Sequence, residues 1–175
     1  MTFVLSSTAF ANGEAIPARY ARWGDNVSPP LRWEGAPEGT RSFALILDDP
    51  NAPFTTFCHW AVYDIPVETS ELAEGAGTSD GGLRPRFRQA INVYRHDCYD
   101  GPQPPPLHGT HHYHFRLLAL DVEALPVGSH PTAAEVETAA EPFVIGEAQL
   151  IGTFKKTLFG SHARAASTAP LSRAP

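Results

Sequence analysis

A short apolar run that ends in an acidic, proline-rich loop constrains the fold more than any other stretch of this sequence. Residues 43–47 read Phe-Ala-Leu-Ile-Leu, and residues 48–53 read Asp-Asp-Pro-Asn-Ala-Pro. The run has the length and composition of a buried strand, and the two prolines stiffen the loop that follows. Asp48 and Asp49 are therefore expected at a strand end. The pattern fits equally well a functional carboxylate or a turn whose aspartate faces water.

Proline and glycine recur along the whole chain rather than in one segment. The sequence has 17 prolines and 14 glycines among 175 residues, which favours many short strands joined by turns over a helical bundle. This length is sufficient for one domain with one core. We therefore expect a mainly β fold.

Charge and cysteine usage exclude several classes of protein. The formal net charge is −6 and the chain has no Lys/Arg-rich run, which argues against a nucleic-acid partner. Cys58 and Cys98 have neither CxxC nor zinc-site spacing, so a disulfide between them is left open. The sequence shows no signal peptide and no transmembrane segment. A cytoplasmic location is the simplest interpretation.

Periodicity predicts the other main elements. Residues 57–65 are mostly apolar on both alternating faces, which indicates a central strand with His59 and Ile65 on one face and Cys58 and Trp60 on the other. Strands are also predicted over 111–121 and 148–154. A capping-box pattern at residues 132–135 predicts a short helix. Residues 66–90 are expected to form a long surface loop, and 101–106 (Gly-Pro-Gln-Pro-Pro-Pro) a rigid extended segment.

Polar side chains next to proline-rich loops are the candidates for chemistry. Asp49, His59, His111 and Tyr113 each stand near a strand end, and in a partly dry cleft they would form a small anion site, because imidazole and phenol donate to phosphate oxygens. Gln103 adds a backbone N–H. Asp49 would fix an imidazole tautomer, raise its pKa or bind a ligand amine. The alternative is that His59 is a core histidine bonded to a backbone carbonyl.

Other arrangements have weaker support. His112 and His114 could ligate a metal with His108 or His96, but exposed loop histidines are commoner, so no metal is predicted. Cys58 and His59 are strand neighbours on opposite faces, which argues against a thiol nucleophile.

Five ordered motifs resemble the phosphatidylethanolamine-binding protein (PEBP) family, in particular its bacterial Raf-kinase-inhibitor-like branch. They occupy residues 26–33, 48–53, 59–60, 101–105 and 111–121. The resemblance implies a PEBP-like fold of two antiparallel β-sheets with a few short peripheral helices. It would cover residues 1–156 as a single domain, with 157–175 as a C-terminal tail.

The resemblance also implies a surface pocket for phosphate, phosphorylated headgroups or carboxylates, without a cofactor. It makes the Ala52–Pro53 bond a candidate for the cis form. The implied ligand-binding residues are Asp49, Pro50, Asn51, Pro53, His59, Gln103, His111 and Tyr113. This chain departs from the family in Asn51, which replaces an aspartate and so weakens selectivity for a cationic headgroup. It also departs in His112, which replaces an arginine, so anion attraction at the rim becomes smaller and pH-dependent.

Three functions follow as hypotheses. The first is a protein that binds a small anion and modulates a kinase or other protein partner, with a homodimer as a plausible assembly. The second is a cyclase, dehydratase or isomerase that uses Asp49, His59, His111 and Tyr113 as acids and bases. The third is an interaction protein with a vestigial pocket. Binding is expected over catalysis, because the members of the resembled family point this way. Catalysis would need a side chain whose pKa is shifted toward neutrality, whereas binding requires only donors of fixed geometry.

Overall fold

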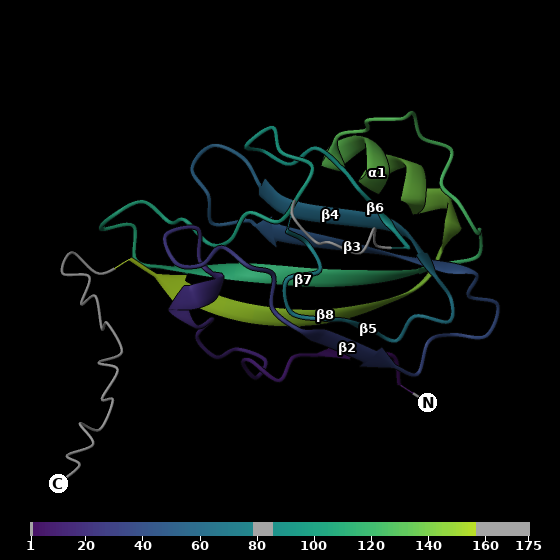
Figure 1. The fold of residues 1–175 in the computed structure, drawn as a ribbon, viewed down its shortest axis with the longest axis horizontal. Helices are drawn as coiled ribbons and strands as arrows, with labels where there is room; N and C mark the ends of the chain where they lie inside the picture. Colours follow the sequence, from purple (N-terminus) through teal and green to yellow (C-terminus); the bar gives the residue numbers. More distant parts are fainter. Residues whose placement is uncertain (1, 79–85, 157–175) are drawn as a thin grey trace, which may run out of the picture.

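The computed structural model describes residues 2–78 and 86–156, and its regular elements are mostly strands (Figure 1). In chain order these elements are β1 (Val4–Ser6), η1 (Ala18–Tyr20), β2 (Leu31–Glu34), β3 (Ser42–Asp49), β4 (Phe57–Pro66), β5 (Glu71–Leu72), β6 (Arg88–Gln89), β7 (Thr110–Leu120), α1 (Ala133–Ala140), η2 (Glu141–Phe143) and β8 (Val144–Lys155). The strands form an antiparallel sheet in the order β1-β2-β5 and another in the order β6-β4-β3-β7-β8. The expected mainly β fold with two antiparallel sheets is confirmed.

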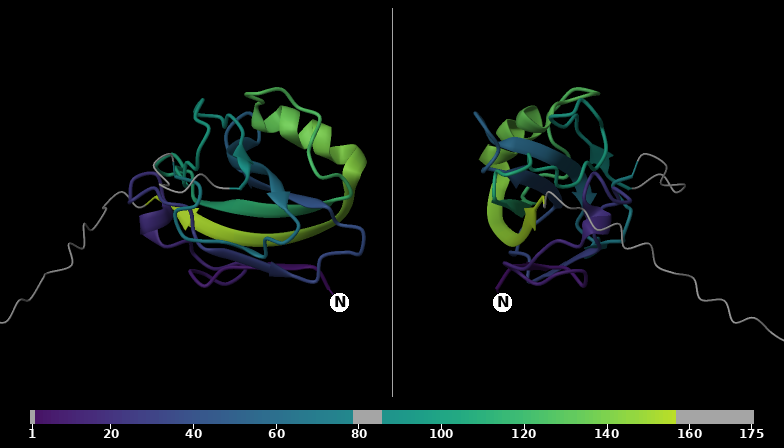
Figure 2. Two further views of the ribbon diagram at one scale, coloured as in Figure 1. Left: turned by 45° about the vertical axis from the view of Figure 1, so that its right-hand side comes forward. Right: turned by 90° about the vertical axis from the view of Figure 1, so that its left-hand side faces the viewer.

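The larger sheet is covered on both faces (Figure 2). One face packs against the smaller sheet through a core that includes Trp33, Phe43 and Phe115, and the other packs against α1 through a cluster that includes Ile46 and Val136. All eight residues of β3 are buried. This explains why its apolar run does not alternate with polar residues, since a strand between two covered faces has no solvent side.

Strand β4 departs from the strict alternation that its sequence predicts. Its pairing with β3 shifts register between Phe43 and Leu45 and again between Leu47 and Asp48. Each shift is an irregularity of the β-bulge type, which places neighbouring residues out of the two-residue period. Ile65 consequently packs with the sandwich core that holds Trp60, and Cys58 packs against the α1 cluster. The predicted face of both residues was wrong, as was that of His59, whose ring contacts Tyr113 of the core that holds Trp60.

Of the remaining predictions of local structure, some agree with the structure and others differ from it. Strand β7 follows the predicted strand closely, and β8 begins four residues earlier than expected. The capping box of α1 forms, with Thr132 Oγ1 accepting from the Glu135 N–H and the Glu135 carboxylate accepting from the Thr132 N–H. The expected loop 66–90 contains the short strands β5 and β6, while its residues 79–85 lie outside the described part of the chain, as does the predicted tail 157–175.

Two further observations concern the Ala52–Pro53 peptide bond and the length of the helices. The Ala52–Pro53 bond is trans, because the described residues contain no cis peptide. The cis expectation was wrong, and trans is the favoured form of an X–Pro bond by about 0.5–1 kcal/mol. Among the described helices, none is long and apolar enough to cross a membrane.

Candidate functional site

The end of β3 and the start of β7 bring a carboxylate and an imidazole together. The two strands are antiparallel neighbours, so the last residues of one lie beside the first residues of the other. Asp49 Oδ2 lies 2.7 Å from His111 Nδ1, and both side chains are buried. Because a carboxylate accepts, Nδ1 of His111 carries the proton and Nε2 remains for another partner. Asp49 Oδ1 accepts from the Asn51 N–H at 2.9 Å, which fixes the carboxylate.

His59 on β4 is held from the opposite side by main-chain carbonyls. Its Nδ1 lies 3.1 Å from the oxygens of both Asp100 and Gly101, so it donates to them and leaves Nε2 as an acceptor. Burial lowers the pKa of His59, although the negative charge of Asp49 and these carbonyls oppose that shift. The imidazole is therefore neutral near pH 7. The alternative of a core histidine bonded to a backbone carbonyl describes this nitrogen correctly.

Tyr113 on β7 lies between the two histidines. Its ring is edge-on to His59 with centroids 5.3 Å apart, and it stacks with His111 at 6.5 Å. The Tyr113 hydroxyl is buried and lies close to the Asp49 carboxylate and the Gln103 backbone, but it forms no hydrogen bond of full geometry with any described residue. Burial, and then the charge of Asp49, raises the pKa of this phenol, which therefore stays a donor. An unpaired buried hydroxyl costs about 1–3 kcal/mol, so this donor calls for an acceptor.

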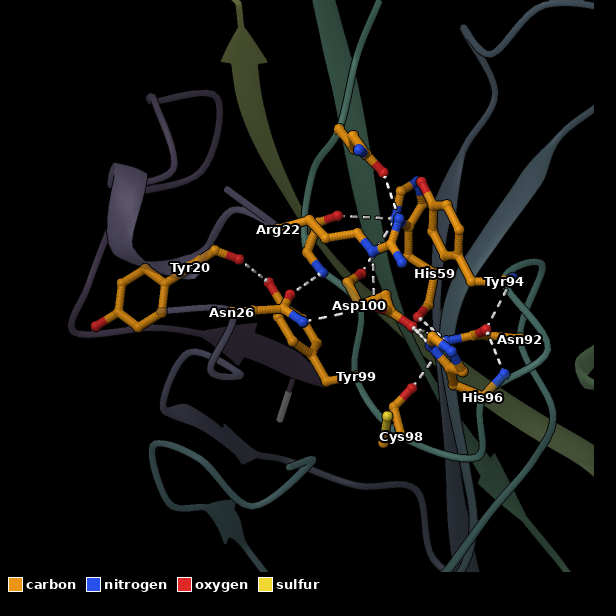
Figure 3. A network of polar contacts seen from close by, with 12 residues as sticks. Tyr20, Arg22, Asn26, His59, Asn92, Tyr94, His96, Cys98, Tyr99 and Asp100 are labelled. Atoms are coloured by element: carbon orange, nitrogen blue, oxygen red, sulfur yellow. Dashed lines mark hydrogen bonds and ion pairs between the residues drawn. The ribbon is translucent and has the colours of Figure 1, made fainter. Parts of the chain in front are cut away.

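A second layer behind His59 is built around Asp100 (Figure 3). Asp100 accepts from Arg22 Nε at 3.0 Å, and from Asn92 Nδ2 and His96 Nδ1 at 2.8 Å each. Burial acts to raise the pKa of Asp100, but these bonds outweigh it, so the pKa lies below its ordinary value. The network positions the carbonyls that bind His59. Sequence reasoning missed it, since residues 22 and 92 belong to no motif that marks them.

Arg22 and Asn92 connect this layer to neighbouring segments. The Arg22 guanidinium lies 4.0 Å from the ring centroid of Tyr94 and donates to the Gln103 side chain at 2.7 Å. Asn92 also donates to the His59 carbonyl oxygen at 3.2 Å. The expected role of Gln103 through its backbone N–H stays a prediction, whereas its side chain serves to hold Arg22.

Other predicted residues lie at the rim or on the far face. Asn51 Oδ1 accepts from the His112 N–H at 2.8 Å, which ties the loop after β3 to β7. Asp48 faces α1 and binds Arg116 at 2.6 Å, so only the second aspartate of the pair belongs to the site. Pro50 lines a hollow of about 380 Å³ together with Asp48, and Pro53 is half-buried in the same loop.

The cysteines and surface histidines add no catalytic group to this site. Burial raises the pKa of the Cys58 thiol well above its ordinary value, so it is not a nucleophile at neutral pH. Cys58 and Cys98 are not joined in a disulfide. Of the histidines considered as metal ligands, His112 contacts Asn51 and His114 contacts Gln149.

Comparison with known proteins identifies relatives that match most of the chain. The family model described as phosphatidylethanolamine-binding protein matches residues 6–155. A UPF0098 protein of Aquifex aeolicus is 42% identical over 153 residues, which are 86% of each chain. A Mycobacterium tuberculosis protein named as a lipoprotein, LppC, is 36% identical over 86% of this chain and 71% of its own. The crystal structure of Escherichia coli YbcL, described as a member of the mammalian PEBP family, superposes with a TM-score of 0.85 at 32% identity, over 90% of this chain and all of YbcL.

Proposed function

This chain belongs to the phosphatidylethanolamine-binding protein family, and from that premise we propose that it binds a small anion through Asp49, His59, His111 and Tyr113. The observation that carries the proposal is the buried cluster in which the Tyr113 ring contacts the imidazoles of His59 and His111 and its hydroxyl has no hydrogen bond of full geometry. The ligand class is a phosphate, a phosphorylated headgroup or a carboxylate.

The donors and acceptors at the site match a partly protonated anion. Tyr113 offers an O–H, while the imidazoles of His59 and His111 each use Nδ1 for a protein partner and leave Nε2 for the ligand. A phosphomonoester that keeps one proton can accept from the phenol and donate to an imidazole. The Asp49 carboxylate repels an approaching anion, and its bond to His111 offsets that repulsion. Since all four side chains are almost fully buried, only a small group can reach them.

Titration with anions tests the proposal. Phosphate, phosphoethanolamine and acetate would be titrated by calorimetry or NMR into the full chain and into His59→Ala and Tyr113→Phe. We expect saturable binding, which His59→Ala abolishes and Tyr113→Phe weakens roughly tenfold, because one hydrogen bond is worth about 1–1.5 kcal/mol. Tyr63→Phe is the matched control, since Tyr63 is a buried tyrosine in the cluster under α1. Equal affinities in wild type, His59→Ala and Tyr113→Phe would contradict the site.

The buried Asp49–His111 pair favours acid–base chemistry as the alternative function. A carboxylate that orients an imidazole is the arrangement of a general base, and Tyr113 could donate a proton. The enzyme would then be a cyclase, dehydratase or isomerase of a small anionic metabolite. Turnover of a bound ligand, lost in His111→Gln with binding retained, would favour this alternative over binding alone.

The remaining expectations concern partners and location. A kinase-like protein partner and a homodimer stay predictions, as does the cytoplasmic location. The relative named as a lipoprotein makes cell fractionation the direct test of location.

A further inference from the structure

Three side chains of the segment between Asn92 and Gly101 gather their ligand atoms at one point. His96, Cys98 and Asp100 stand at alternate positions, and one nitrogen, sulfur or oxygen atom of each lies within 4.8 Å of the other two. Figure 3 shows the three side chains on the same side of the network, away from the ring of His59. They are the one group of three potential metal ligands found among the described residues.

The spacing of these atoms is close to that of a tetrahedral metal site. Ligand atoms around zinc lie about 3.3–3.8 Å from one another, given bond lengths of about 2.0–2.3 Å. His96 Nδ1 and Asp100 Oδ2 are now 2.8 Å apart, and the widest separation in the group is at most 4.8 Å. Shifts of about 1 Å or less would therefore form the site, and the half-exposed His96 side chain has room to make them.

The surroundings of Asp100 are those of a supported metal ligand. Arg22 and Asn92 bind its two oxygens and hold the carboxylate in one orientation, as outer-shell partners do around metal centres. Asp100 and a Cys98 thiolate would supply two negative charges against the single positive charge of Arg22, which leaves a net attraction for a cation. His96 and Cys98 provide access from solvent, since neither is fully buried.

We propose that His96, Cys98 and Asp100 bind a divalent transition metal ion, with zinc as the best match to a nitrogen, sulfur and oxygen ligand set. The ion takes the place of the hydrogen bond between His96 and Asp100, and the Cys98 thiol releases its proton to solvent when it binds the ion. Three protein ligands leave a fourth position for water. No metal was predicted from the sequence, because exposed loop histidines are commoner than metal ligands. The competing interpretation is a His96–Asp100 hydrogen bond that only fixes the loop.

This site is separate from the proposed anion site. Asp100 faces His59 with its main-chain oxygen and the metal ligands with its carboxylate. Failure to bind phosphate would therefore leave the metal proposal intact, and failure to bind metal would leave the anion proposal intact.

Cobalt absorption tests the proposal directly. Co²⁺ would be titrated into the full-length chain with its thiols reduced, and Zn²⁺ would then be added as a competitor. We expect one Co²⁺ per chain with a thiolate-to-cobalt absorption band that Zn²⁺ removes. Cys98→Ser should lose that band, and His96→Gln should weaken binding at least about tenfold.

Matched variants control for other ligands and for misfolding. Cys58→Ser removes the thiol on the α1 side and should keep the band, as should His130→Gln, which changes an exposed histidine. Circular dichroism establishes that each variant is folded. The proposal is overturned if wild type binds no stoichiometric Co²⁺, or if folded Cys98→Ser keeps the same band.

Discussion

At the residue scale, His59 links the protonation of the site to the stability of the fold. Burial lowers its pKa, so the unfolded chain takes up this proton at a higher pH than the folded chain does. Stability then falls as pH decreases below about 6.5, with a slope of at most about 1.4 kcal/mol per pH unit. Denaturant unfolding of wild type and His59→Gln between pH 7.5 and 5 measures how the free energy of unfolding changes with pH. The variant should lose the slope, and His130→Gln should keep it.

The same protonation should strengthen anion binding. An imidazolium gives Nε2 a proton to donate and a charge to attract the ligand, so the bound anion favours the protonated form of His59. We expect phosphate affinity to rise as pH falls toward the lowered pKa of His59, below the ordinary histidine range, with protons taken up on binding. Calorimetry in buffers of different ionisation enthalpy counts those protons. Affinity independent of pH across this range would show that His59 does not titrate with the ligand.

How far the sequence predicts individual residues depends on whether their contacts are local. Asp49, His59, His111 and Tyr113 lie in motifs, and the structure places them together. Arg22 and Asp100 are 78 positions apart and their pairing leaves no local pattern. The sequence therefore predicts the side chains of the proposed anion site better than those that hold them in position.

At the scale of elements, Arg116 joins three of them by charge. It lies on β7 and binds Asp48 of β3 and Glu137 of α1. Burial raises the pKa of Asp48, although Arg116 opposes that shift. Arg116→Met should destabilise the fold by about 2–4 kcal/mol, because it leaves a buried carboxylate without its partner.

Two further variants separate the charge effect from lost packing. Adding Asp48→Asn to Arg116→Met should recover part of the loss, since the unpaired charge is then gone. Arg41→Met breaks an exposed pair with Glu123 and should cost less than about 1 kcal/mol. Urea unfolding at pH 7 gives all three values. Equal costs for Arg116→Met and Arg41→Met would mean that Arg116 contributes no more than a surface ion pair.

Strand β4 shows why element patterns predict only part of the arrangement. Its central residues alternate as expected, but the two register shifts against β3 move Cys58 and Ile65 to the other faces. A shift of this kind depends on how a partner strand pairs, which the period of one strand does not contain. The short strands β5 and β6 were missed for another reason, because a strand of two residues is too short to show a period in its sequence.

At the scale of the whole molecule, ligand binding should stabilise the fold by mass action. The proposed anion site draws residues from β3, β4 and β7, and its supports come from the segments around residues 22, 92 and 100. An anion that binds only the folded chain at 100 times its Kd adds about 2.7 kcal/mol, which for this length raises Tm by roughly 5–10 °C. Thermal unfolding measures this rise in Tm when it is carried out in phosphate and compared with chloride of equal ionic strength.

Two variants test whether the stabilisation by phosphate comes from binding at the proposed site. Tyr113→Phe should show a smaller shift in Tm at the same phosphate concentration, because its weaker binding lowers the ratio of ligand to Kd. Tyr63→Phe should keep the wild-type shift, since Tyr63 belongs to the cluster under α1 and not to the proposed site. General salt effects on hydrophobic burial would instead raise Tm equally in all three proteins. An equal rise would therefore assign the stabilisation to phosphate as a salt and not to a bound anion.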